Sequence, residues 1–316
     1  MELRQLRTFR SVAELGSLSK AADRLRIAQP ALSRQIKLLE HELRTPLFVR
    51  NGRGMALTDA GKVLLARIGG LVRQLEQVRD DVASLSGTPS GQVVLGVVPT
   101  VSTVLASRLA QAVLRDRPGI SLRIVESFGG HLLEWLHRGE LDLAVIYGRG
   151  PDLHLRTETL ARDELMVVGG RGSGLAKRKG VSIEWLARQP LILPSPPHGL
   201  RTLIDTAAAK RKLSLNVLLE TDSFRVQMDV VENGHGYTVL PPSAIFRELQ
   251  QGRLEAAPIT APRLPRELVL AFPTGRAPSL ATEAIAGLVR VEVAAVGKDG
   301  HWSAVASPAK KSARAG

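Results

Sequence analysis

The sequence predicts a multi-domain α+β protein with a helical domain first, a long connecting helix second and an α/β domain third. Three observations predict this order. Two short helical patterns lie close together within residues 16–43, a heptad repeat of apolar residues starts at Leu64, and strand-like runs alternate with helical patterns after residue 91. At 316 residues, the chain is long enough for two or three domains.

The composition limits the class of protein. Hydrophobic residues make up 44% of the chain and aromatic residues 3%, so the cores must be aliphatic, as in parallel sheets. The lack of cysteine excludes disulfides, thiolate nucleophiles and cysteine metal sites, and it is compatible with a reducing compartment. The first residues are charged and periodic, unlike a signal peptide, and no apolar run approaches the roughly 20 residues of a membrane-spanning helix. We therefore expect a soluble, cytoplasmic protein without a membrane partner.

Residues 16–43 predict a helix, a tight turn and a second helix. Ala21 and Ala22 are small enough to let the two helices approach closely. The apolar seam between the helices consists of Leu25, Ile27, Leu32, Ile36 and Leu39. The opposite face of the second helix carries Gln29, Pro30, Ser33, Arg34 and Lys37. These side chains can contact base edges and phosphates in a major groove, so the pattern favours a helix-turn-helix that binds DNA.

A purely structural helical hairpin is the alternative, and the charge distribution argues against it. Residues 1–57 contain 11 Lys and Arg against 5 Asp and Glu, a net charge of +6 out of +13 for the whole chain. A small domain this basic fits a polyanionic partner, because neutralising phosphates releases counterions.

The first sixty residues resemble the N-terminal domain of LysR-type transcriptional regulators. The matching residues are Leu3, Arg4, Gln5, Leu6, Phe9, Ala21, Ala22, Leu25, residues 29–36 (QPALSRQI), Leu39, Glu40, residues 47–50 (LFVR) and residues 57–61 (LTDAG). The resemblance implies a winged helix-turn-helix in a regulator that binds double-stranded operator DNA as a homodimer or a dimer of dimers. It also implies a small-molecule effector, RNA polymerase as a partner, and association with the nucleoid. On this basis the predicted DNA contacts are Ser19, Lys20, Gln29, Pro30, Ser33, Arg34, Lys37, Arg50 and Arg53.

Residues 44–57 predict a short β-hairpin that completes a DNA-binding domain of residues 1–57. Residues 47–50 and 54–57 would pair across Asn51, Gly52 and Arg53, and Asn-Gly is a strong turn signal. In the family this hairpin is a wing beside the minor groove, which implies a DNA contact for Arg53 and a backbone contact for Arg50. Alternatively, Arg50 packs against the helices.

Two residues depart from the family pattern. Ala28 replaces the usual capping Ser or Thr, and Arg44 replaces the usual Gly after the second helix.

Residues 58–87 predict a linker helix capped by Thr58. Its apolar residues recur in alternating steps of four and three, which favours packing against a second copy of the helix. The predicted dimerisation residues are Leu64, Ile68, Leu71, Leu75, Val78, Val82 and Leu85. Alternatively, the stripe lies on its own domain.

Residues 92–297 predict the α/β domain, after a turn-rich linker. The expected strands are 92–98, 120–127, 141–147, 164–169, 190–193, 217–222, 237–241 and 267–272, and the expected helices are 102–116, 130–138, 199–212, 223–233, 243–250 and 279–295. Spacing alone indicates a parallel α/β domain. The resemblance implies two subdomains like those of type II periplasmic binding proteins, 92–162 with 266–297 and 163–265. Residues 298–316 are small, basic and aperiodic, so we expect a disordered tail.

The predicted ligand site lies at the carboxyl ends of strands, where helix N-termini favour anions. Two segments fit by position, 99–103 and 195–202, and the resemblance adds residues near 128, 147 and 224. The predicted effector-binding residues are Thr100, Ser102, Thr103, Phe128, Gly129, Tyr147, Ser195, His198, Arg201, Thr202 and Phe224. The expected effector is a small anionic metabolite, with no cofactor and no metal. The alternative for each hydroxyl is an ordinary helix cap.

Other classes of protein explain less of the sequence. A solute-transport protein would account for residues 92–297 but not for the basic N-terminus. An enzyme would need a nucleophile elbow or a dinucleotide fingerprint, and neither is complete. His131 and His137 are six residues apart on a helix and point away from each other, unlike a zinc pair. Residues 127–134 and 141–147 are most similar to the nitrogen-assimilation-control branch of the LysR family.

Overall fold

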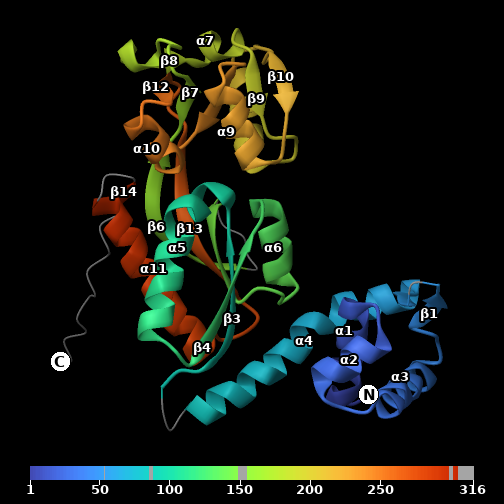
Figure 1. Cartoon of the computed structure of the whole chain (residues 1–316). Helices are drawn as coiled ribbons and strands as arrows, with labels where there is room; N and C mark the ends of the chain where they lie inside the picture. Colours follow the sequence, from blue (N-terminus) through green and yellow to red (C-terminus); the bar gives the residue numbers. More distant parts are fainter. Residues whose placement is uncertain (53, 85–87, 149–154, 299–301, 305–316) are drawn as a thin grey trace, which may run out of the picture. The chain divides into compact units, whose positions relative to one another are not determined.

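The structure is a computed structural model that describes residues 1–52, 54–84, 88–148, 155–298 and 302–304 (Figure 1). The chain divides into two compact units. The first comprises Met1–Gly87 with His137–Glu140, and the second comprises Thr88–Leu136 with Leu141–Gly316. None of the described helices is long and apolar enough to cross a membrane.

Three helices form the core of the first unit: α1 (Leu3–Leu15), α2 (Leu18–Leu25) and α3 (Gln29–Leu43). The side chain of Ser17 accepts from the backbone N–H of Lys20 and caps α2. Ala21 and Ala22 are buried, as the predicted close approach of the helices requires. The buried core of this unit consists of Leu6, Phe9, Val12, Ala21, Ala22, Leu32, Ile36, Leu39, Leu47, Phe48, Ile68 and Val72.

The hairpin and the long helix follow as predicted. Strand β1 (Phe48–Asn51) pairs antiparallel with β2 (Gly54–Leu57), and Asn51 lies opposite Gly54. Helix α4 (Asp59–Ser84) begins where the Thr58 Oγ1 accepts from the backbone N–H of Gly61 at 3.0 Å. The same hydroxyl donates to the Pro46 carbonyl oxygen at 2.7 Å, which fixes the start of α4 beside the hairpin.

The second unit contains two six-stranded sheets. The first has the order β14-β6-β13-β5-β3-β4. Its strands are β3 (Gly91–Val97), β4 (Ile120–Glu126), β5 (Leu143–Gly148), β6 (Leu155–Glu164), β13 (Pro265–Pro273) and β14 (Ser303–Ala304). Its helices are α5 (Pro99–Asp116), α6 (Gly129–His137) and α11 (Leu280–Lys298), and α11 packs beside α5 (Figure 1). A Cβ at Gly96 of β3 would lie 2.9 Å from Leu132 Cδ2, so α6 approaches the sheet closely there.

The second sheet has the order β10-β9-β11-β7-β12-β8. Its strands are β7 (Met166–Gly170), β8 (Val181–Ser182), β9 (Leu191–Leu193), β10 (Val217–Glu220), β11 (Tyr237–Leu240) and β12 (Leu254–Ala261). Its helices are α7 (Ile183–Ala187), α8 (Gly199–Ala209), α9 (Phe224–Glu232) and α10 (Pro242–Gln250), with the 3-10 turn η1 (Leu175–Lys177).

The chain passes between the two sheets twice. Strand β6 leads into β7, β12 leads into β13, and β6 and β13 pair antiparallel. The changes of sheet lie next to the predicted subdomain boundaries at residues 162–163 and 265–266.

Two expectations need correction. Both sheets are mixed rather than parallel. In one sheet β7 pairs antiparallel with β11 and with β12, and in the other β13 pairs antiparallel with β5 and with β6. The predicted disordered tail also begins too early. Helix α11 continues to Lys298, β14 pairs with Ala161 and Arg162 of β6, and Trp302 is 4% exposed in the core. Residues 305–316 lie outside the described residues.

Candidate nucleic-acid interface and ligand site

The outer face of α3 carries the residues that the sequence predicts to contact DNA. Gln29, Pro30, Arg34 and Lys37 are exposed, and Ser33 is half-buried. Ser19 and Lys20 are exposed at the start of α2. The Ser19 hydroxyl donates to Oε1 of Gln29 at 3.3 Å, so the two helices present adjoining polar groups.

The start and end of α3 are held by backbone geometry rather than by side-chain caps. Ala28 makes no capping hydrogen bond, and Pro30 lies in the first turn instead. Arg44 adopts the left-handed conformation (φ 53°) that favours glycine, and its N–H bonds to the carbonyls of Glu40 and His41. The helix is also tied to α1, because the Thr8 hydroxyl donates to Gln35.

The hairpin is attached to α3 by Glu40. Its Oε1 accepts from the backbone N–H groups of Leu47 at 2.8 Å and Phe48 at 3.2 Å. The Phe48 ring lies 5.2 Å from the Phe9 ring, centroid to centroid. Arg50 is exposed, which does not fit the alternative of packing against the helices. Arg53 lies outside the described residues.

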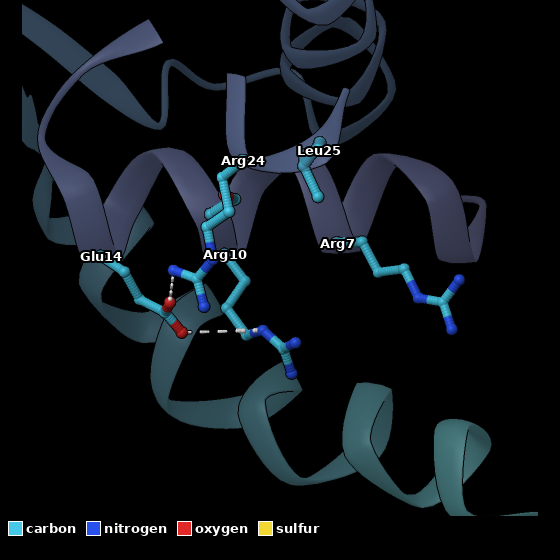
Figure 2. A pocket seen from close by; sticks show the side chains of 6 residues that line it. Arg7, Arg10, Glu14, Arg24 and Leu25 are labelled. Carbon is cyan, nitrogen blue, oxygen red and sulfur yellow. Dashed lines mark hydrogen bonds and ion pairs between the residues drawn. The ribbon is translucent and has the colours of Figure 1, made fainter. Parts of the chain in front are cut away.

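A small pocket lies between α1 and α2 (Figure 2). It is lined by Arg7, Arg10, Ser11, Glu14, Arg24 and Leu25. Glu14 accepts from Arg24 at 2.6 Å and lies 3.7 Å from Nε of Arg10, so its carboxylate lies between two guanidinium groups. The sequence did not predict this pocket, and it contains none of the predicted DNA contacts.

The heptad stripe of α4 divides into two parts. Leu64 is half-buried and Ile68 is 2% exposed, and both pack on the core of their own unit. For these two residues, the alternative that the stripe lies on its own domain is correct. Leu71, Leu75, Val78 and Val82 are 53–64% exposed. Leu85 lies outside the described residues.

The predicted ligand site collects residues from both sheets of the second unit. Thr100, Ser102 and Thr103 lie within the first five residues of α5, after β3. Phe128 and Gly129 follow β4, and Tyr147 lies near the end of β5. From the other sheet, Ser195, His198 and Thr202 follow β9, and Phe224 begins α9. The rings of Phe128 and His198 meet edge to face at 4.8 Å, so the two sets of residues touch.

Several of these polar groups bond within the protein. His198 caps α8, since its Nδ1 accepts from the N–H of Leu200 at 3.1 Å, as the helix-cap alternative expects. The Thr202 hydroxyl donates to the His198 carbonyl at 3.1 Å. The Ser195 hydroxyl and N–H donate to Asp222, and the hydroxyl bond holds the pKa of that carboxyl below its usual range.

Arg201 is engaged by neighbouring protein groups. Its guanidinium bonds to Asp205 at 3.0 Å, Glu220 at 2.6 Å and the Pro194 carbonyl at 3.2 Å. This arginine therefore joins α8 to β10 and to the loop after β9, which is a structural role beside the predicted effector contact.

Tyr147 leads to a buried polar cluster that sequence reasoning missed. Its hydroxyl donates to Asp163 Oδ2 at 3.1 Å, and the Ser243 hydroxyl donates to the same oxygen at 3.2 Å. The guanidinium carbon of Arg266 lies 3.5 Å from the centroid of the Tyr147 ring. Asp163 is 3% exposed, and burial raises its pKa to about 6 and also raises the pKa of Tyr147.

The geometry of the first unit defines the class of protein. This unit contains a core of three helices, a hairpin attached to α3, and an exposed polar face on α3. This arrangement is a winged helix-turn-helix, the form typical of DNA-binding transcriptional regulators. The second unit adds two six-stranded sheets, between which the chain passes twice.

Comparison with known proteins gives the family. Residues 3–62 match the model of the bacterial regulatory helix-turn-helix proteins of the lysR family, and residues 86–294 match the LysR substrate binding domain. The chain belongs to the LysR family of DNA-binding transcriptional regulators, and its second unit is the family's substrate-binding domain.

Two relatives and one solved structure illustrate the similarity. The chain is 36% identical over 245 residues to the nitrogen assimilation regulatory protein nac of Escherichia coli, covering 77% of this chain and 79% of that protein. It is 31% identical over 297 residues to the regulator BbuR of Bordetella bronchiseptica, covering 94% and 91%. A full-length OxyR of Pseudomonas aeruginosa has the same fold, with a TM-score of 0.71 at 23% identity, covering 93% and 94%.

Glu40 supplies a prediction for the hairpin. Glu40→Ala leaves the N–H groups of Leu47 and Phe48 without their acceptor, which costs about 1–3 kcal/mol of hairpin stability. We expect faster hydrogen exchange at both amides and weaker DNA binding. Glu40→Gln keeps an acceptor oxygen and is the matched control. Equal exchange rates in the two variants would contradict this role.

The raised pKa of Asp163 predicts that the stability of the protein depends on pH. Because burial raises its pKa from 3.8 to about 6, its stabilising contribution is complete below pH 3.8 and is lost as the pH rises through about 6. The loss is about 3 kcal/mol at neutral pH. Asp163→Asn keeps the acceptor oxygen and removes the titration, so the stability of the variant relative to the wild type should increase between pH 4 and pH 7. Thermal unfolding of both proteins across this range measures it, and parallel curves would refute it.

Proposed function

We propose that the exposed face of α3 reads the operator sequence in the major groove. The observation that carries this proposal is the exposure of Gln29, Arg34 and Lys37 on one helix face, in a domain of net charge +6. Amide and guanidinium groups form paired hydrogen bonds with adenine and guanine edges, respectively. Ser19, Lys20 and the hairpin with Arg50 flank this face and would bind the DNA backbone.

We further propose that the chain works as a homodimer or a dimer of dimers. Leu71, Leu75, Val78 and Val82 supply an exposed apolar stripe on α4 that a second copy of the helix can cover. A two-fold assembly would place two copies of α3 on successive half-sites of the operator.

The proposed signal is a small anionic metabolite bound among the residues that the two subdomains contribute to the ligand site. Contact between Phe128 and His198 joins the two subdomains beside these residues, so a ligand there would bias how they close. The proposed role is regulation in the cytoplasm through RNA polymerase at the nucleoid, without enzymatic turnover. The similarity to nac supports a place near the nitrogen-assimilation branch.

Substitution of Arg34 tests whether α3 reads the base sequence of the operator. Arg34→Ala should lose about 1–3 kcal/mol of discrimination between operator and random DNA, because a specific base contact is removed. Arg24→Ala is the control, since Arg24 is paired with Glu14 in the pocket between α1 and α2. Binding to both DNAs is measured at one salt concentration. An unchanged ratio for Arg34→Ala would exclude the proposed reading.

Substitution of Leu75 tests whether the exposed stripe of α4 forms the dimer interface. Leu75→Lys places a charge in the middle of the exposed stripe and should shift sedimentation from dimer toward monomer. Val63→Lys is the matched control, because Val63 is 63% exposed on the same helix but outside the stripe. If Leu75→Lys sediments as an intact dimer, the stripe is not the interface.

A further inference from the structure

Arg266 presents two hydrogen-bond donors that no described residue accepts. Its Nε and Nη2 atoms are both buried and without a hydrogen-bond partner in the described part of the chain, although the side chain as a whole is half-buried. The N–H groups of these two atoms lie on the same edge of the planar guanidinium. This edge is the fork that binds both oxygens of a carboxylate in parallel. A buried donor without an acceptor is costly, so the fork is suited to an incoming group rather than to stability.

The fork is held in place on several sides. The guanidinium carbon lies over the Tyr147 ring, 3.5 Å from its centroid, and the Tyr147 hydroxyl is itself bonded to Asp163. Strand β13, which carries Arg266, pairs with β5 on one side and β6 on the other. An arginine fixed in this way loses little side-chain entropy when a ligand binds.

The charges nearby select the kind of ligand. Asp163 lies directly opposite Arg266 in the β6–β13 register, and its Oδ2 accepts from Tyr147 and Ser243. The ionised carboxyl offsets the guanidinium charge without occupying the fork. A singly charged carboxylate fits beside it, whereas a doubly charged phosphoryl group would meet stronger repulsion. The raised pKa of Asp163 lets the site take up a proton as an anion enters.

We propose that the Nε–Nη2 fork of Arg266 binds a carboxylate group of the effector. This inference rests on the proposed effector site, because Tyr147 belongs to both, and it names the chemical class of the ligand as a carboxylic acid. Arg266 is then the residue that orients the ligand at the point where the chain passes between the two sheets. Its neighbours Asp163 and Ser243 position the fork through Tyr147.

Thermal unfolding of the full-length protein in sodium formate, compared with sodium chloride at equal ionic strength, tests the proposal. Formate is the smallest carboxylate, and it should raise the unfolding temperature saturably, by about 3 °C at ten times its dissociation constant. Arg266→Gln should abolish the formate effect, and Arg266→Lys should weaken it, because lysine lacks the planar fork. Formate that acts no better than chloride on the wild type would overturn the proposal, whether or not the variants fold.

Arg156→Gln is the matched control. The Arg156 guanidinium also stacks on an aromatic ring, 4.5 Å from the centroid of Phe272, but it is 56% exposed and paired with Glu283. This variant should respond to formate as the wild type does, and an equal loss in both variants would show a general anion effect and refute the fork. In Asp163→Asn, the formate effect should no longer strengthen as the pH falls from 8 to 6.

Operator binding separates the two proposals. A wild type that binds the operator but ignores formate would refute the fork alone. A wild type that does not distinguish operator from random DNA would refute the proposed reading by α3.

Discussion

The antiparallel pairing of β6 with β13 is the constraint on which the second unit depends. Both strands belong to the first sheet; β6 leads directly into β7 of the second sheet, and β13 directly follows β12 of that sheet. Any change in the angle between the sheets must therefore act on the few residues between β6 and β7 and between β12 and β13. Asp163 and Arg266 lie opposite each other beside these crossings, so a buried carboxyl and a half-buried guanidinium lie where motion would concentrate.

The buried carboxyl of Asp163 links the two sheets as well as the two crossing strands. Tyr147 reaches it from β5 of the first sheet, and Ser243 reaches it from α10, which follows β11 of the second. Burying a carboxylate is costly, and two hydroxyl donors with a nearby guanidinium offset this cost while the sheets keep their present distance. Polar contacts of this kind depend on direction and distance, so they define one arrangement more sharply than aliphatic packing does.

The sequence predicted the first unit well because its signals are local. The Asn51-Gly52 turn, the Thr58 cap and the apolar spacing of residues 16–43 each act within a few residues. Strand β6 was missed because its sequence, LRTETLARDE, is largely exposed and does not alternate. Without that strand, Asp163 had no place in the site, and its bond with Ser243 joins residues 80 positions apart. Heptad spacing likewise identified Ile68 as part of a stripe but not the surface that it covers.

The burial of Trp302 changes where the substrate-binding domain ends. The family model stops matching at residue 294, yet Val296 and Trp302 are buried in the core of the first sheet, and β14 extends that sheet beyond β6. A fragment cut at the family boundary would lack an indole that fills the core and would expose one edge of a crossing strand to solvent. Expression of this domain in isolation therefore requires the chain to run through Ala304.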